Sequence, residues 1–526
     1  NQLALAYGDD YAVFNERLET SKPFEVVLTN AQRAFNEWTK LPKEERKAAD
    51  LMKILDIDFS ILLDNVTIAR SRKHITKYYD ISDELDEARQ SKWKSISEIG
   101  SFPKRLKPVS YYCDIAKQEY TLAYNDIFNT LMNLTMSVYA PMNYILPSRL
   151  AKYEELYDTK VGASTLKQSN RERALQRLMT INMLKRLESC VESFRITVRK
   201  ITEINKNTYN SILEYERSST HSTMEFSQIS EDDFENDDFD LTNDSTLGKV
   251  KIDFADMDLR SWKEDLKKDI ETLEMLYDIM AFATPDKDLK LQKLIEVIEN
   301  KINNPFNPGN RKVLVFSAFA DTTNYLYENI APLLKEKYGI CSARIQGAQA
   351  GNTSNVGGNN ETDRLLTLFS PISKERSQTY PADQNVDIDL LIATDCVSEG
   401  QNLQDCDICI NYDIHWNPVR IVQRFGRIDR IGSKNEYIQL VNFWPNVSLD
   451  EYINLNARVE NRMALVDATA TGDDNLLTSE QADLDYRKEQ LKKLQDGELQ
   501  DLEDVDGSIA ITDLGLNEFR MDMIAY

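Results

Sequence analysis

The sequence predicts an α/β fold in which a mostly parallel sheet is joined to extensive all-helical regions. Its 526 residues suggest two to four domains, at roughly 100–200 residues each. Only 17 glycines and 14 prolines are present, about half the usual share, which favours helices over a turn-rich all-β architecture. Short, uninterrupted apolar runs between residues 312 and 443 indicate strands covered on both faces, as in a parallel sheet.

Five of these runs are the expected strands, and helical or loop segments separate them. They are KVLVF (312–316), CSARI (341–345), IDLLIAT (388–394), CDICINY (406–412) and YIQLVNF (437–443). A Gly- and Asn-rich piece at 347–360 is expected to be a flexible loop. An earlier strand is expected within PKRLKPVSYYCDI at 103–115.

Changes in composition divide the chain into four regions. We expect a helical segment at 1–100, a mainly helical region at 101–300, the sheet-bearing domain at 301–450 and a helical extension at 451–526. Within the second region, residues 216–258 are rich in Ser, Thr and acidic side chains. They are expected to form an acidic mobile linker, because they bury too little apolar area to offset the entropy of ordering.

The net charge of −24, from 63 basic and 87 acidic residues, does not by itself exclude a nucleic-acid partner. The acidic excess is local, with seven acids at 231–240, whereas residues 151–206 carry 12 basic against 7 acidic side chains. Two basic stretches, at 70–77 and along the amphipathic helix expected at 171–201, fit two alternatives. They are either solvated helix surface or contacts to phosphates.

Six cysteines are too few for a disulfide scaffold. Cys406 and Cys409 form a lone C-x-x-C inside an apolar run, which favours two core thiols over a zinc site, so no metal ligands are expected. No apolar run is long enough to span a membrane and no signal peptide opens the chain, so we expect a cytoplasmic protein without a membrane partner. Because the first residue is Asn1 rather than Met, we expect a piece of a longer protein.

Two segments carry candidate chemistry. ATDCVSEGQNLQ (393–404) leaves the end of an expected strand, where ligands gather in parallel sheets. HWNPVRIVQRFGRIDRIG (415–432) has Asn417 as an N-cap and Pro418 as a first helical residue, so a helix is expected to begin there.

On that helix, Gln423, Arg427 and Arg430 would share one face. Two arginines one turn apart can grip the oxygens of a transferring phosphoryl group, and Gly426 beside Arg427 would let another surface approach closely. The alternative is a surface pair bonded to carboxylates such as Asp429.

Taken in order, VLVFSAF, ATDCVSEGQNLQ and WNPVRIVQRFGRIDRIG resemble motifs four, five and six of superfamily-two helicases. More narrowly, they resemble the SWI/SNF-like prokaryotic ATPases of the RapA type, over roughly residues 312–445. The resemblance implies that this part is the second RecA-like lobe. It also implies that residues 1–100 follow a first motor lobe that this sequence lacks.

The resemblance also implies roles for individual residues. Arg427 and Arg430 match arginine fingers that reach the γ-phosphate of ATP. Gln423, Glu399, Gly400 and Asn402 match residues that sense the nucleotide. Ser317, Phe319 and Thr394 lie where the family contacts the nucleic-acid backbone.

No G-x-x-x-x-G-K-[ST] motif occurs, since Gly248-Lys249 has no glycine five residues before it. ATP with Mg²⁺ would therefore be held mainly by the absent first lobe, and no cofactor is expected in this chain alone. The expected function is the C-terminal part of an ATP-dependent helicase or translocase acting on nucleic acid, with double-stranded DNA as the expected track. The alternative is a catalytically silent scaffold that binds nucleic acid or protein.

Overall fold

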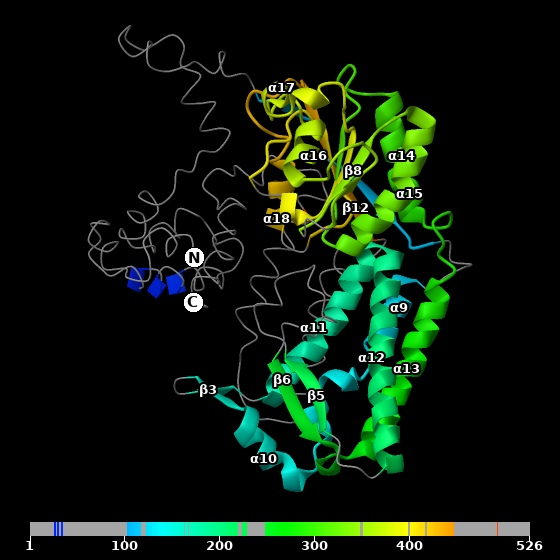
Figure 1. Ribbon diagram of the computed structural model, residues 1–526, viewed down its shortest axis with the longest axis vertical. Coiled ribbons are helices and arrows are strands. Elements are labelled where there is room, and N and C mark those ends of the chain that lie inside the picture. The colour runs from blue at the N-terminus through cyan, green and yellow to red at the C-terminus, as the bar shows by residue number, and fades with distance from the viewer. Residues whose placement is uncertain are drawn as a thin grey trace.

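The computed structural model describes residues 102–116, 123–161, 164–166, 168–218, 223–228, 248–347, 351–397, 400–415 and 418–445, with a few isolated positions near residue 30 and at residue 492. The helical segments expected at 1–100 and 451–526 therefore lie almost wholly outside the described residues. Figure 1 shows a sheet-bearing part above and a helical part below, in the described portion of the chain.

Eight described strands form one sheet in the order β1-β12-β11-β7-β10-β8-β9, with β2 also paired to β12. Their bounds are β1 (Lys104–Arg105), β2 (Val109–Cys113), β7 (Val313–Phe316), β8 (Ser342–Ile345), β9 (Thr353–Ser354), β10 (Leu390–Ala393), β11 (Ile408–Asn411) and β12 (Tyr437–Pro445). Every pairing in this sheet is parallel except that of β8 with β9. The predicted parallel sheet and its five apolar strands are confirmed.

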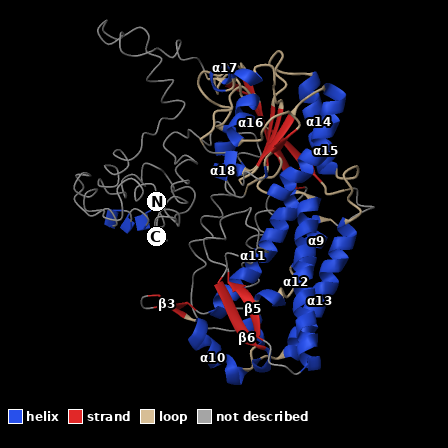
Figure 2. Ribbon diagram, in the orientation of Figure 1, coloured by secondary structure: helices blue, strands red, loops and turns tan. Residues whose placement is uncertain are grey.

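Alternate residues of the strands pack into different cores, which explains why the apolar runs are continuous. In β7, Leu314 and Phe316 belong to a core shared with α16 (Thr362–Phe369) and α18 (Pro418–Phe425). Val313 and Val315 belong to a second core shared with α14 (Leu289–Asn303) and α15 (Ala320–Tyr338). The sheet is therefore sandwiched between helices on both faces (Figure 2). Short turns α17 (Arg376–Thr379), η7 (Pro381–Asp383) and η8 (Asp395–Val397) complete this part.

Two expectations for this part need correction. The strand expected at 103–115 forms, as β1 and β2, but both pair with β12, so the boundary predicted at residue 301 divides a single sheet. The loop expected at 347–360 is partly ordered, because β9 pairs with β8 and Asn355 Oδ1 accepts a hydrogen bond from Ser342 N at 2.7 Å. Cys406 and Cys409 are buried, as expected of core thiols.

The helical part packs three long helices around two apolar cores. Its elements are α9 (Tyr124–Leu131), η2 (Ser137–Tyr139), η3 (Pro141–Tyr144), α10 (Pro147–Tyr157), α11 (Gln168–Ser189), α12 (Val191–Ser218), η5 (Phe254–Asp256) and α13 (Leu259–Met280). The apolar stripe predicted along 171–201 packs against α13, through side chains such as Leu184, Phe194 and Val198. No described helix is both long enough and apolar enough to span a bilayer.

The prediction of a mobile linker at 216–258 is wrong at both ends of this segment. Helix α12 continues to Ser218, and β5 (Thr223–Gln228) pairs antiparallel with β6 (Gly248–Asp253). Alternation of apolar and polar residues in TMEFSQ and GKVKID supports this hairpin, and Ile252 is buried in the core around Trp262. The acidic run at 231–240 lies outside the described residues. A second hairpin joins β3 (Thr159–Val161) to β4 (Ser164–Leu166).

Candidate nucleotide and nucleic-acid site

The candidate site lies at the carboxyl ends of β7, β10 and β11. Since these strands are parallel neighbours, the loops that follow them emerge at the same edge of the sheet. Backbone hydrogen bonds hold the loops in place: Ser317 N donates to Ala393 O at 3.1 Å, and Tyr412 N donates to Phe316 O at 2.9 Å. Helix α18 follows β11 and lies beside this edge (Figure 1).

Helix α18 begins at Pro418, as predicted, but it ends at Phe425. Arg427 and Arg430 therefore lie in the turns after the helix rather than on it, which corrects the expected single helical face. After the helix, a backbone hydrogen bond joins residues three apart rather than four, since Arg427 N donates to Arg424 O at 3.2 Å. At Gly426 an added Cβ would lie 3.2 Å from Val422 O, which leaves little room for a side chain at the helix end.

The two arginines nevertheless face the same loop, at residues 400–404. Arg427 Nη1 donates to Gln401 O at 3.4 Å, and the Arg427 carbonyl accepts from Leu403 N at 3.0 Å. Arg430 Nη1 donates to Asn402 Oδ1 over a short distance. Gly400 has a φ of +70°, a left-handed conformation that favours glycine and turns the chain into this loop. Glu399 lies outside the described residues.

Backbone carbonyls of α18 and of the turn that follows it bind the other side of each guanidinium. Arg427 Nε donates to Gln423 O at 3.0 Å, and Arg430 Nε donates to Gly426 O at 3.2 Å. The side-chain oxygen Oε1 of Gln423 is buried without a hydrogen-bond partner. The structure thus brings together four of the predicted nucleotide-site residues, namely Gln423, Asn402, Arg427 and Arg430.

Arg430 is half-buried and, among the described residues, forms no ion pair with a carboxylate. Burial lowers the pKa of its guanidinium, although an arginine stays charged at any physiological pH. Asp429, the carboxylate named in the alternative interpretation, accepts a hydrogen bond from Arg105 Nε of β1 at 2.6 Å.

Sequence reasoning missed Arg424, whose side chain is fully buried. It binds Asp395 through two parallel hydrogen bonds, from Nε at 2.6 Å and from Nη2 at 2.7 Å, and its Nη1 donates to Asn411 Oδ1 at 3.1 Å. Burial alone would raise the pKa of Asp395, but the charge of Arg424 and these hydrogen bonds lower it. A signal was present in the sequence, because Arg424 falls on the apolar face that Ile421 and Ile428 define.

Asp413, which follows β11, is a second missed residue. Its Oδ2 accepts hydrogen bonds from Ser317 Oγ at 2.5 Å and from Ser189 Oγ at 2.6 Å, while its Oδ1 accepts from Ala318 N at 2.9 Å. The Asp413 carboxylate also lies 3.8 Å from Arg424 Nη2. Asp413 therefore links the loop after β7, helix α18 and the helical part of the chain.

The three predicted nucleic-acid contacts have buried side chains. Ser317 binds Asp413, Phe319 packs under the guanidinium of Arg186 at 4.9 Å, and Thr394 Oγ1 donates to Cys396 Sγ at 3.2 Å. A side chain that is covered by its own protein cannot touch a phosphate in this conformation. The contact to nucleic acid by these three residues stays a prediction. No group of three or more potential metal ligands occurs among the described residues.

A mostly parallel sheet with helices on both faces is the architecture of a RecA-like domain. Residues 289–432 match the helicase conserved C-terminal domain family. Over these residues the chain is thus similar to the C-terminal domain of superfamily-two, SWI/SNF-like helicases.

Two relatives are similar to short segments of this chain, one named as an ATP-dependent helicase and the other as an RNA polymerase-associated protein. An uncharacterized ATP-dependent helicase, YqhH of Bacillus subtilis, is 44% identical over 66 residues, which span 12% of this chain and 12% of that protein. The RNA polymerase-associated protein RapA of Pectobacterium atrosepticum is 33% identical over 80 residues, 15% of this chain and 8% of RapA. The matched segments thus span about a tenth of these relatives. A solved helicase domain, Pyrococcus furiosus Hef, aligns with 75% of this chain and 63% of its own at 14% identity, with a TM-score of 0.31.

Proposed function

We propose that this chain is the C-terminal part of an ATP-dependent helicase or translocase, and that Arg427 and Arg430 act as its arginine fingers. One observation carries the proposal. Arg430 is a half-buried cation, held against the 400–404 loop by Asn402 and by the Gly426 carbonyl, that has no carboxylate partner among the described residues. A cation in that state gains most from an added anion, because the anion would offset the cost of its partial burial.

The γ-phosphate of ATP is an anion that the guanidinium groups of Arg427 and Arg430 could bind. A guanidinium stays charged and can bind two phosphate oxygens at once, so it stabilises the charge that spreads over a transferring phosphoryl group. The two guanidinium groups are already oriented by the carbonyls of Gln423, Gly426 and Gln401, which limits reorganisation when the phosphate arrives. Asn402 and Gly400 would shape the same pocket.

The remaining parts of an ATP site are proposed to lie on a first motor lobe outside this chain. The sequence has no phosphate-cradling G-x-x-x-x-G-K-[ST] motif, and the described residues offer no cluster of carboxylates for Mg²⁺. Nucleic acid, with double-stranded DNA as the proposed form, would bind through its phosphates at the same strand ends, near Ser317, Phe319 and Thr394.

The test replaces Arg430 by alanine in the full-length protein. We expect kcat for ATP to fall at least about 100-fold with little change in ATP affinity, since arginine fingers contribute about 10³–10⁵ in rate. Arg427→Ala should behave alike. Arg260→Ala is the matched control, because Arg260 is exposed and pairs only weakly with Glu264 at 3.5 Å on α13.

The rival candidate is a silent scaffold that keeps the fold without the chemistry. It predicts that Arg427→Ala and Arg430→Ala leave any ATP turnover unchanged. Turnover at the level of the Arg260→Ala control in both variants would reject the arginine fingers. Retention of both arginines favours the motor, because a scaffold has no need for a half-buried cation such as Arg430, which has no carboxylate partner among the described residues.

A further inference from the structure

The junction between α11 and α12 contacts the motor lobe where the strands β7 and β11 end. Helix α11 ends at Ser189 and α12 begins at Val191, so only Cys190 separates the two helices. Cys190 and the residues beside it make the contact. Ser189 Oγ donates to Asp413 Oδ2 at 2.6 Å and also lies 2.7 Å from Thr322 Oγ1 of α15. Ser189, Thr322 and Asp413 are all buried, so these contacts are protected from water.

A buried lysine fastens the same junction from the other side. Lys290 of α14 donates from Nζ to Glu188 O at 2.5 Å and to Ser189 O at 2.9 Å. Its ammonium also lies 4.4 Å from the ring of Tyr412, the residue that follows β11. A cation at the last carbonyls of a helix is stabilised by the helix dipole, so Lys290 locks the end of α11 to the lobe.

A third polar contact lies one turn before the end of α11. Arg186 Nη1 donates to Asp321 Oδ2 at 2.7 Å, and its guanidinium lies over the ring of Phe319. Phe319 lies in the loop between β7 and α15, and Asp321 lies in the first turn of α15. The apex of the two helices is thus held by side chains of α14, of α15 and of the loop after β11.

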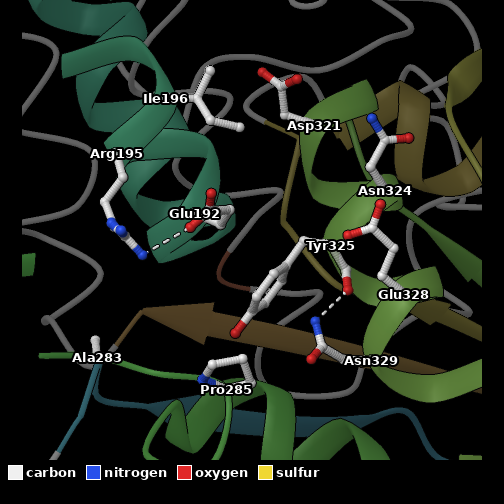
Figure 3. A pocket seen from close by; sticks show the side chains of 10 residues that line it. All are labelled: Glu192, Arg195, Ile196, Ala283, Pro285, Asp321, Asn324, Tyr325, Glu328 and Asn329. Carbon is white, nitrogen blue, oxygen red and sulfur yellow. Dashed lines mark hydrogen bonds and ion pairs between the residues drawn. The ribbon is translucent and has the colours of Figure 1, made fainter. Parts of the chain in front are cut away.

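Apolar packing beside this apex is incomplete. A cavity of about 450 Å³ separates α12 from α15, and Figure 3 shows Glu192, Arg195 and Ile196 on one side of it with side chains of α15 on the other. Cys190 at the apex packs in one core with Leu326 of α15, and the hydrogen bonds and the ion pair described above add a specific polar connection between the two parts.

The connection continues from Asp413 to the candidate site. Arg424 Nη1 donates to the Asp413 carbonyl at 3.2 Å, and the same guanidinium holds Asp395 in the turn after β10. Arg424 is also part of α18, and the turns after this helix carry Arg427 and Arg430. A continuous chain of buried polar contacts therefore runs from Ser189 through Asp413 and Arg424 to both motifs.

We propose that Ser189 and Lys290 are positioning residues for the motor site, which couple the docking of the helical part to the placement of Asp413, Arg424 and the arginine fingers. This inference rests on the proposed function. Both residues would act through others, Ser189 through Asp413 and Lys290 through the end of α11. The helical part would thereby set the rate of hydrolysis without contributing to ATP binding.

The first test measures ATP turnover of the full-length protein with Ser189→Ala. We expect kcat to fall about 10-fold, the factor that corresponds to about 1.4 kcal/mol of coupling, while KM for ATP and nucleic-acid affinity stay unchanged. Ser342→Ala is the matched control, because Ser342 is equally buried in the same lobe but its Oγ has no hydrogen-bond partner to lose. Lys290→Met should repeat the kcat effect from the other side of the junction.

A second readout does not depend on hydrolysis. Cys396 is exposed and lies next to Asp395, so its labelling by a thiol reagent in the 526-residue chain reports the position of that turn. We expect site-resolved labelling of Cys396 to change at least about 3-fold in Ser189→Ala, through altered local opening, and to stay constant in Ser342→Ala.

Measuring kcat and Cys396 labelling together distinguishes failure of the coupling from failure of the proposed function. Unchanged kcat and unchanged Cys396 labelling in both Ser189→Ala and Lys290→Met, with Arg430→Ala inactive, would overturn the coupling and leave the proposed function standing. Wild-type turnover in Arg430→Ala would overturn the proposed function. In that case altered labelling in Ser189→Ala would still support the structural connection, and unaltered labelling would reject it.

Discussion

Arg424 and Arg430 are six residues apart and have opposite surroundings. Arg424 is fully buried and neutralised by Asp395 and Asp413, whereas Arg430 is half-buried and bonded only to neutral acceptors among the described residues. Removing one partner of a buried charge pair leaves an uncompensated charge, so Arg424 serves the fold. Arg430 has no carboxylate partner among the described residues, which is why it is proposed as a ligand-binding side chain.

Glu172 of α11 gives a prediction about pH. Its carboxylate accepts hydrogen bonds from Met142 N at 2.9 Å and from Gln168 Nε2 at 3.3 Å, but burial outweighs both and raises its pKa from 4.5 to about 8. A raised carboxyl pKa means that the fold favours the protonated form. Its contribution is therefore full below about pH 4.5 and is lost as pH rises towards 8, by at most about 1.4 kcal/mol per pH unit.

We expect Glu172→Gln to remove this loss, because the amide stays neutral. Urea unfolding should show the variant more stable than the wild type near pH 9 and close to it near pH 5. Glu203→Gln on the exposed side of α12 is the control and should shift neither curve. An equal pH dependence in Glu172→Gln and the wild type would show that another group carries it.

At the scale of single residues the sequence predicted candidate side chains for a ligand, but not the side chains that hold the surrounding loops. Arg427 and Arg430 were found from their spacing, whereas Arg424, Asp413 and Ser189 were not. Ser189 and Asp413 bind each other across more than 200 residues of sequence, and no local pattern encodes such a contact. Only Arg424 left a local trace, as a charge on an apolar helix face.

At the scale of elements, α14 is fastened to the start of β11 by a buried ion pair. Lys301 Nζ lies 2.7 Å from Asp407 Oδ2, which also accepts from Asn307 Nδ2 at 2.7 Å. Burial raises the pKa of Asp407, while the charge of Lys301 opposes that rise. The pair therefore fixes where the helix meets the sheet, at the cost of removing two charges from water.

We expect Lys301→Met to lower the free energy of unfolding by about 3–5 kcal/mol, because Asp407 is left buried without its cation. Adding Asp407→Asn should recover most of that loss, since the amide oxygen can keep the bond to Asn307. Lys337→Met is the control for an exposed pair, with Glu299 at 2.7 Å, and should cost less than about 1 kcal/mol. Additive losses in the double variant, measured by urea unfolding, would argue against a coupled pair.

Strands and long helices were predicted well because each shows its own periodicity or apolar run. The errors fall where tertiary pairing decides the outcome. Strands β5 and β6 pair on either side of a polar segment whose composition alone suggested a linker. Strands β1 and β2 pair with β12, which is more than 300 residues away in the sequence. The end of α18 at Phe425 was missed because the helical spacing of its charged residues continues past Gly426.

At the scale of the whole molecule, the sheet-bearing part and the helical part share a buried polar contact region around Ser189 and Asp413. The sequence divided the chain at residue 301, yet α14, which begins at Leu289, packs on the sheet and holds the end of α11. The two parts are thus linked at the strand ends that carry the candidate site, which is where motion of one part would reach the other.

The sequence also predicts whether the isolated chain can hydrolyse ATP. Purified alone, the 526-residue protein should hydrolyse ATP no faster than buffer, with or without DNA, because its sequence has no G-x-x-x-x-G-K-[ST] phosphate cradle. Arginine fingers stabilise a phosphoryl group that other residues hold, so they cannot act without that cradle. DNA-stimulated hydrolysis that disappears in Arg430→Ala would show that the chain contains a complete site. Activity that survives in Arg430→Ala would instead indicate a contaminating ATPase.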